Sequence, residues 1–439
     1  MTETSPKHNL KALTQELVAK GKRYYVPNYK PREMILDRGD GATVWDLEGK
    51  DYIDLGAGIA VCGLGHQDPD LYEALVNQAK KLWHTSNIFY TEPPIRLAEA
   101  IVEATPFAQR VYFCNSGAEA NEAAIKLARK YASGQGRAPE YRQIMTFVGS
   151  FHGRTLTTVT ATAQPKYQEG FEPLPAGFIY CPQFNDEEAV RRMMSDKICA
   201  ILVEPIQGEG GVMPAKPGFL KFLRDICDEY GALLMIDEVQ TGVGRTGKLF
   251  AHEWDGIEPD VMTLAKALGG GLPIGAMLVG PKAADVLQFG SHGSTFGGNP
   301  VMCAVALASL TKINTPVMMA QVEARAQLLT NALTHMQEVL GCFTQIRGRG
   351  LMVGAELAPE WHGKAGDISE AARQAGVLVL VAGPNVMRFL PPLTITEEEL
   401  QLGLTRFRKA LEAFIGGEKP KSGDDGLLSR VFRKIVGKG

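Results

Sequence analysis

The 439-residue sequence lacks several features that would point to a particular class of protein. It has no C-x-x-C pair among its seven cysteines, which argues against a zinc site or a disulfide framework. Its formal net charge is only −3, so it carries no broad basic field that would attract nucleic acid. No apolar run is long enough to span a membrane, and the N-terminus is polar. The sequence indicates a globular protein of a reducing compartment, and we expect it in the cytoplasm.

Two nucleotide-binding signatures are also missing. The stretch Gly242-x-x-x-x-Gly247-Lys248 resembles a phosphate-binding P-loop, but Leu249 stands where that motif has a magnesium-binding hydroxyl. The G-x-G-x-x-G fingerprint is absent from the first strand-helix turns, which disfavours a dinucleotide-dependent dehydrogenase.

Four parts are expected along the chain. Residues 1–70 hold a polar arm with one short amphipathic helix, followed by a hairpin at Thr43–Leu47 and Tyr52–Leu55. Residues 71–310 alternate helical stretches with short apolar strands, which predicts a mostly parallel sheet covered by helices on both faces. Residues 311–415 form a smaller α+β domain. Residues 416–439 form a linker and an amphipathic tail that packs on its own protein or, alternatively, docks on a partner or an anionic surface.

The apolar runs predict individual elements in both domains. In the large domain we expect strands at Arg110–Phe113, Gln143–Val148, Ala200–Val203, Ala232–Ile236, Val261–Leu264 and Gly275–Val279. In the smaller domain we expect strands at Gln345–Gly348, Met352–Leu357, Val377–Leu380 and Val386–Leu390, with helices at Val317–Val339 and Glu397–Phe414.

Small residues follow the first predicted strand of the large domain. Ser116, Gly117 and Ala118 would lie at a helix N-terminus, where free backbone N–H groups and the helix dipole favour a phosphate. Ligands of open parallel sheets bind at this edge, beyond the carboxyl ends of the strands. The alternative is that Ser116 only caps the helix, with Glu119 completing a capping box.

An acidic pair and a lysine end two later strands. Asp237 and Glu238 close an apolar strand, where an unpaired carboxylate is costly to bury. Lys266 lies among small and apolar residues, which should lower its pKa and make a neutral amine available for a Schiff base. Taken singly, a surface turn and a solvated lysine are the commoner interpretations. Together with the phosphate nest, in what we expect to be consecutive β-α units, they predict a pyridoxal-phosphate (PLP) site.

These segments together resemble the subgroup III (class-III) PLP-dependent aminotransferases of fold type I, and within that group most of all the acetylornithine and succinylornithine aminotransferases. The resemblance runs from about residue 30 to residue 414. It implies an α/β PLP-dependent transferase fold and an enzyme that acts as a homodimer. The stretches that carry it are Phe113–Glu122 (FCNSGAEANE), Phe151–Leu156 (FHGRTL), Val203–Glu209 (VEPIQGE), Asp237–Lys248 (DEVQTGVGRTGK) and Gly293–Pro300 (GSTFGGNP).

The resemblance also implies which residues bind the cofactor. Lys266 would form the Schiff base with PLP and later move a proton on the substrate, and Asp237 would bind the pyridine nitrogen. Gln240 would approach the phenolic oxygen of the ring. Val239 and Phe151 would pack against its two faces.

The phosphate end is expected to involve two subunits. The resemblance implies that Gly117 and Ala118, next to Ser116, hold the phosphate of their own subunit. Thr295 would reach the phosphate bound to the neighbouring subunit, so the homodimer would share its active sites.

Arginines and carboxylates are implied on the substrate side. Arg154 and Arg388 resemble the family's carboxylate-binding arginines, and planar guanidinium groups suit that task. Glu204 and Glu209 resemble its gating carboxylates, one of which would pair with Arg388 in one half-reaction and release it in the other. Ser294 would lie near the acyl group of the substrate.

One residue bears on which amine is used. Ile59 stands where ornithine aminotransferases have a tyrosine that contacts the free α-amino group, so an acylated or absent α-nitrogen is favoured. Cys62, Gly63 and the segment Gln67–Pro69 depart from the family's usual residues, which leaves the acyl group open. His152 follows Phe151 and is expected to be structural.

The expected reaction transfers the terminal amino group of N-acetyl-L-ornithine to 2-oxoglutarate, giving N-acetylglutamate 5-semialdehyde and glutamate, in arginine metabolism. Succinylornithine or 4-aminobutyrate is the alternative donor. An aminomutase or decarboxylase on the same scaffold, and a non-catalytic PLP-fold binding protein, are the other classes considered.

Overall fold

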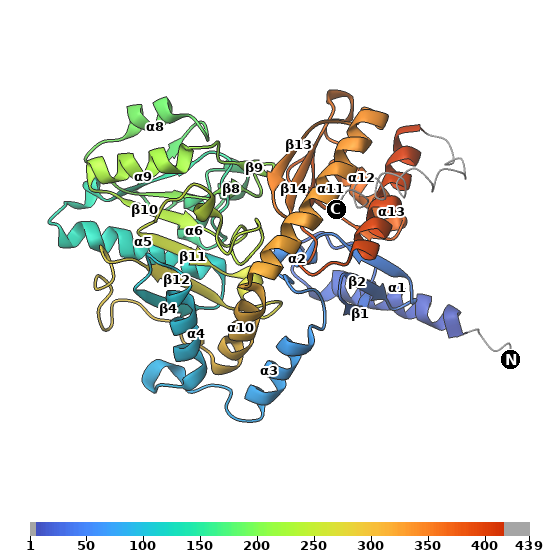
Figure 1. The fold of residues 1–439 in the computed structure, drawn as a ribbon, viewed down its shortest axis with the longest axis horizontal. Coiled ribbons are helices and arrows are strands. Elements are labelled where there is room, and N and C mark those ends of the chain that lie inside the picture. Colours follow the sequence, from blue (N-terminus) through green and yellow to red (C-terminus); the bar gives the residue numbers. More distant parts are fainter. Residues whose placement is uncertain (1–5, 417–439) are drawn as a thin grey trace.

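The computed structural model describes residues 6–416, so the predicted tail from residue 417 onward lies outside the described residues. Figure 1 shows a large lobe built on the central sheet and a smaller lobe that combines the C-terminal domain with the N-terminal hairpin. Within the described part of the chain, no single helix is long and apolar enough to cross a membrane. Helices α10 (Pro300–Ile313) and α11 (Pro316–Leu340) meet that criterion only as a pair bent by 72°.

The large lobe contains a seven-stranded sheet in the order β4-β12-β11-β10-β7-β5-β6. Every residue of β7, β10, β11 and β12 is buried, as expected for strands covered on both faces. The strands are β4 (Arg110–Cys114), β5 (Gln143–Phe147), β6 (Phe178–Cys181), β7 (Ile198–Val203), β10 (Leu233–Asp237), β11 (Val261–Leu264) and β12 (Gly275–Val279).

The sheet is mostly parallel, as predicted, with one exception. Strand β12 runs antiparallel to both of its neighbours, β11 and β4. The connection of residues 265–274 is too short for the crossover of roughly a dozen residues or more that a parallel neighbour needs. The edge strand β6, whose first three residues are only half-buried, was not predicted from the sequence.

Helices cover this sheet on both faces (Figure 1). Helix α5 (Gly117–Gly134) begins at the N-cap Ser116 and packs a stripe of buried alanines against the sheet. Helix α9 (Phe219–Tyr230) buries its apolar face against β7 and β10. The other elements of the lobe are α3 (Pro69–Ala79), α4 (Glu92–Glu103), α6 (Leu156–Ala161), α7 (Pro165–Gln168), α8 (Glu187–Met193) and the hairpin β8 (Ile206–Gln207) and β9 (Met213–Pro214).

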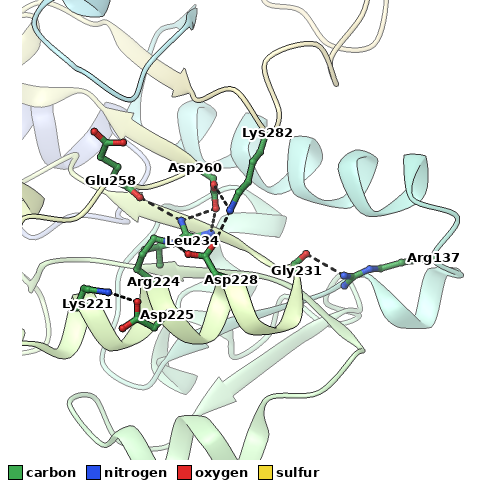
Figure 2. A network of polar contacts seen from close by, with 10 residues as sticks. All are labelled: Arg137, Lys221, Arg224, Asp225, Asp228, Gly231, Leu234, Glu258, Asp260 and Lys282. Carbon is green, nitrogen blue, oxygen red and sulfur yellow. Dashed lines mark hydrogen bonds and ion pairs between the residues drawn. The ribbon is translucent and has the colours of Figure 1, made fainter.

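A network of hydrogen bonds and ion pairs connects the amino ends of β10 and β11 with helix α9 (Figure 2). Asp260, which precedes β11 and is 6% exposed, accepts the backbone N–H of Leu234 at 2.8 Å. Its carboxylate also pairs with Arg224 of α9 at 2.9 Å and with Lys282 at 3.2 Å. This network lies at the opposite edge of the sheet from the carboxyl ends of the strands, where ligands of parallel sheets bind.

The smaller lobe combines two four-stranded sheets. The predicted hairpin is present as β2 (Thr43–Asp46) and β3 (Asp51–Asp54), and β1 (Leu36–Asp40) pairs with β2. The second sheet has the order β13-β14-β17-β16. Its strands are β13 (Phe343–Arg349), β14 (Met352–Leu357), β16 (Leu380–Val381) and β17 (Val386–Phe389), and helices α11, α12 (Ala365–Gln374) and α13 (Glu397–Gly416) pack around them.

Two details of this lobe differ from expectation. The predicted strand Val377–Leu380 is divided at the buried Val379: β15 (Val377–Leu378) pairs with β3, whereas β16 pairs with β17. The N-terminal arm contains a helix of 19 residues, α1 (Pro6–Tyr24), rather than a short one. Because β15 joins the sheet of β3, the first and last thirds of the chain are hydrogen-bonded to each other.

Candidate active site

A cavity of about 420 Å³ lies at the carboxyl edge of the large sheet. The predicted site residues that line it are Ser116, Gly117, Ala118, Phe151, Arg154, Glu204, Asp237, Val239, Gln240 and Lys266. Ile59, Glu209, Ser294, Thr295 and Arg388 lie outside that lining.

The predicted phosphate nest forms the N-terminus of α5. Ser116 caps the helix, because its Oγ accepts the backbone N–H of Glu119 at 3.2 Å and donates to the Glu119 carboxylate at 3.1 Å. The side chain of Ser116 is thus committed to the cap. The backbone N–H groups of Gly117 and Ala118, in the first turn, have no acceptor within the helix and border the cavity. The structure supports an anion-binding helix start made from backbone groups.

The prediction that the nest, the acidic strand end and the lysine lie in consecutive β-α units is wrong. Strands β5, β6 and β7 come between β4 and β10 along the chain. The sheet brings them together all the same, since only β12 separates β4 from β11. Gly117 then lies so close to Val239 that a Cβ on it would be 2.7 Å from Val239 Cγ1.

Asp237 is the last residue of β10 and is only 3% exposed, so the surface-turn alternative is wrong. Its Oδ2 is hydrogen-bonded to His152 Nδ1 at 2.7 Å and accepts from Asn121 Nδ2 at 2.8 Å. Its Oδ1 accepts the backbone N–H of Val239 at 3.0 Å. Asn121 is held in turn by Thr263 at 2.8 Å. These bonds fix the carboxylate at the wall of the cavity, where it can accept a hydrogen bond from a protonated ligand nitrogen.

Lys266 follows β11 and faces the same cavity. Its backbone φ is +46°, a left-handed conformation that a lysine rarely adopts. The pKa of Lys266 is lowered to about 8, chiefly by burial and also by the positive charge of Arg388, while Asp237 opposes both. The amine is therefore neutral far more often than that of a surface lysine near pH 7, which suits a nucleophile.

Glu204 lies beside Phe151 at the cavity wall. Its carboxylate accepts the backbone N–H groups of Phe151 at 2.9 Å and Gly208 at 3.3 Å. The pKa of Glu204 is raised to about 7, chiefly by burial, with His152 opposing the increase and Asp237 contributing to it. Because Glu204 is occupied with backbone groups, it does not pair with Arg388 in this structure.

Arg388 of β17 enters the site from the smaller lobe and is 3% exposed. Its Nη1 forms an ion pair with Glu209 Oε1 at 2.6 Å and a longer bond to Gln240 Oε1 at 3.4 Å. Of the two predicted gating carboxylates, Glu209 is thus the one that holds Arg388. Arg154 lines the cavity and is exposed, with its guanidinium 4.1 Å from the ring centre of Tyr167.

Ile59, Ser294 and Thr295 lie outside the cavity lining. Ile59 is 44% exposed and belongs to the turn α2 (Ala57–Ala60), whose residues have left-handed backbone angles, with φ +64° at Ile59. Ser294 Oγ accepts the Asn115 side-chain amide at 3.0 Å, which ties its loop to the nest. Thr295 is exposed.

Comparisons with known proteins give the family of this chain. The family model "Aminotransferase class-III" matches residues 24–411. The chain belongs to the class-III aminotransferases. It is 57% identical to the acetylornithine aminotransferase of Xanthomonas campestris pv. campestris over 393 residues, covering 89% of this chain and 96% of that protein. It is 51% identical to the succinylornithine transaminase of Yersinia pseudotuberculosis, covering 89% and 95%.

A solved structure supports the same assignment. The crystal structure of N-acetylornithine aminotransferase from Stenotrophomonas maltophilia K279a has a TM-score of 0.81 and 50% identity, covering 91% of this chain and all of that one. The predicted fold type I, with its mixed α/β architecture, is therefore confirmed. Class-III aminotransferases depend on PLP.

The residues of this aminotransferase fit that cofactor. One end of the cavity offers backbone N–H groups at a helix start, which suit a phosphate, and the other offers the buried Asp237, which suits a protonated ring nitrogen. Lys266, whose pKa is lowered to about 8, faces the same cavity.

Sequence reasoning missed two residues of this site and undervalued one. Asn121 and Asn115 were not singled out, and His152 was expected to be only structural, yet Asn121 and His152 together hold Asp237. A signal existed for Asn121, because it is the polar member of an otherwise alanine-rich buried helix face. For His152, only the fold reveals the contact.

Proposed function

We propose that this class-III aminotransferase transfers the terminal amino group of N-acetyl-L-ornithine to 2-oxoglutarate, giving N-acetylglutamate 5-semialdehyde and glutamate in arginine metabolism. The observation that carries the proposal is the pairing of Arg388 with Glu209 beside Lys266. The guanidinium of Arg388 would bind the α-carboxylate of 2-oxoglutarate. Glu209 would pair with the same guanidinium while the uncharged part of the amine donor is bound. Relatives named for acetylornithine support the same substrate.

PLP, when bound, supplies the electron sink and carries the amino group between the two half-reactions. Asp237, held by His152 and Asn121, would keep the ring nitrogen protonated. Gly117 and Ala118 would anchor the phosphate, and Val239 and Phe151 would hold the ring between them. The remaining chemistry would rest on Lys266 Nζ, which in its neutral form takes the proton from the amine-bearing carbon of the donor and returns one in the second half-reaction.

The donor would be selected at the mouth of the cavity. Arg154 would bind the α-carboxylate of the acylated ornithine, and Ser294 would lie near its acyl group. Ile59 offers no hydrogen-bond acceptor to a free α-ammonium group, which favours an acylated or absent α-nitrogen. N-succinylornithine is the second candidate, because relatives that are 51% identical are named for it, and 4-aminobutyrate is the third.

We also propose a homodimer with shared active sites, in which Thr295 binds the phosphate in the partner subunit. Thr295 is exposed and lies next to Phe296, which is 60% exposed. Asn87 bonds the carbonyls of Ser294 and Gly297, which brings the exposed Ile88, Phe89 and Tyr90 to the same face. Apolar side chains gathered in this way favour contact with another subunit. Seven unpaired cysteines, six of them buried, support a reducing compartment, and we propose the cytoplasm.

Initial rates decide between these donors. N-acetylornithine, N-succinylornithine, 4-aminobutyrate and ornithine are each assayed against 2-oxoglutarate, and we expect the highest kcat/KM with N-acetylornithine. Turnover without 2-oxoglutarate would contradict an aminotransferase and favour an aminomutase or decarboxylase. A preference for free ornithine would contradict the role of Ile59, and a Lys266→Ala enzyme of normal rate would contradict the role of Lys266.

A further inference from the structure

The stretch that resembles a P-loop, residues 242–248, lies between the two lobes. It continues the loop that carries Asp237, Val239 and Gln240. Its central side chain, Arg245, is 1% exposed and is one of the largest fully buried side chains of the protein. The stretch therefore packs between the two lobes, although its sequence resembles a phosphate-binding loop.

Arg245 binds the backbone of the smaller lobe at two separate points. Its Nη1 donates to the carbonyl of Leu351 at 3.0 Å and to that of Pro391 at 2.5 Å. The carbonyl of Arg245 itself accepts the N–H of Leu351 at 3.0 Å. At Gly350 the two lobes approach so closely that a Cβ would lie 2.6 Å from the Arg245 oxygen. One arginine thus joins the cofactor loop to two segments of the smaller lobe.

No carboxylate accompanies this guanidinium among the described residues. Arg245 Nε and Nη2 are buried without a hydrogen-bond partner, and burial lowers the pKa of Arg245 to about 9. Burying a cation in this way is costly, and apolar residues would join two lobes at lower cost. What the guanidinium adds is a rigid planar donor that fixes two carbonyls at defined positions.

The second of these carbonyls lies on the strand extension that follows Arg388. Pro391 comes three residues after Arg388, and neither Pro391 nor Pro392 has an N–H with which to hold the extension. The N–H of Leu390 donates to Leu55 at 2.7 Å, within the smaller lobe. Arg245 therefore supplies a direct bond between this extension and the loop that carries Asp237 and Gln240.

We propose that Arg245 is a positioning residue for Arg388. It would set the distance between the guanidinium that binds the substrate carboxylate and the loop that holds the cofactor. The inference rests on the proposed role of Arg388. Because a hydrogen bond to a charged group contributes about 1.5 kcal/mol or more, misalignment of Arg388 after loss of this bond should weaken dicarboxylate binding by about tenfold.

The test uses the PLP-loaded enzyme with Arg245→Met and Arg245→Lys. The quantities measured are KM for 2-oxoglutarate, Ki for glutarate as a non-reacting dicarboxylate, PLP affinity and Tm. Arg406→Met is the control, because Arg406 also bonds a backbone carbonyl, that of Gly376 at 2.9 Å, in addition to its ion pair with Asp51, and both contacts lie within the smaller lobe. For Arg245→Met we expect KM and Ki to rise about tenfold with PLP affinity unchanged, and for Arg245→Lys a smaller rise, since a lysine can satisfy one carbonyl. Arg406→Met should lower Tm and leave KM unchanged.

Unchanged KM and Ki in the Arg245 variants would overturn the proposal, and so would an equal rise in Arg406→Met. If Arg245→Met does not fold, the values for Arg245→Lys decide. Arg388→Lys separates this inference from the proposed function. If that variant binds glutarate like the wild type, Arg388 does not hold the carboxylate and the proposed role itself fails. If Arg388→Lys loses glutarate and the Arg245 variants do not, only the inference about Arg245 is wrong.

Discussion

Replacing Lys266 by methionine should stabilise the PLP-free protein at neutral pH. The pKa of Lys266 is lowered from 10.5 to about 8, mainly by burial, so folding with a protonated Lys266 costs free energy. At about 1.4 kcal/mol per pKa unit the full cost is roughly 3 kcal/mol, and contact with water in the cavity reduces it to about 2–3 kcal/mol. Methionine retains most of the side-chain volume without the charge. Lys266→Met should therefore gain stability while losing all transaminase activity.

The pH dependence separates this effect from packing. The cost is complete below pH 8, where the folded and unfolded chains both bind the proton, and disappears as the pH rises through 10.5, where both are neutral. The advantage of Lys266→Met should thus shrink by about 2 kcal/mol between pH 7 and pH 9.5 in urea unfolding of the PLP-free proteins. Lys282→Met is a control of opposite sign: burial is the largest single effect on the pKa of Lys282 and lowers it, but Asp228 and Asp260 together outweigh burial and raise that pKa. A stability advantage of Lys266→Met that does not change between pH 7 and pH 9.5 would refute the reasoning.

Three further changes test the site and the fold. Gly117→Ala should weaken PLP binding by about tenfold or more in an absorbance titration, because its Cβ would meet Val239 at 2.7 Å and disturb the nest; unchanged affinity would contradict that nest. Asp260→Asn should destabilise the protein by about 3 kcal/mol in urea without changing KM, since it breaks buried ion pairs far from the cavity. Glu209→Gln should lower KM for 2-oxoglutarate several-fold, about 1 kcal/mol, because Arg388 no longer has to leave a charged partner; an increased KM would contradict gating by Glu209.

The buried strands could be predicted closely from the sequence. The bounds of β11, β12 and β14 match expectation residue for residue, because each is a mainly apolar segment with a polar residue, a glycine or a proline within two residues of either end. Edge strand β6 could not be distinguished in this way, since its half-buried residues carry a weaker pattern. The direction of β12 was predictable in principle from its short connection. The division of Val377–Leu380 between two sheets depends on contacts far apart in sequence and was not.

The site was predictable where function requires an unusual residue at a strand end. Lys266 and Asp237 stand out because a lysine and a carboxylate are costly among apolar neighbours. Asn121 and His152 are ordinary residues in their own segments and become significant only when the sheet places them around Asp237. Arg245 belonged to a stretch that was set aside as a failed P-loop, and only its buried contacts reveal a place for it.

The charges of the site depend on one another, which gives the Arg388–Glu209 pair a second consequence. Arg388 lowers the pKa of Lys266, whereas Glu209 and Glu204 raise it. If Arg388 lost Glu209 and gained no other carboxylate, its uncompensated positive charge would lower the pKa of Lys266 further. In the proposed reaction, Arg388 would instead exchange Glu209 for a substrate carboxylate, so that one negative charge replaces another at the same guanidinium. The amine of Lys266 would thereby keep its proton affinity through both half-reactions, so that the same group could serve as base in one and as acid in the other.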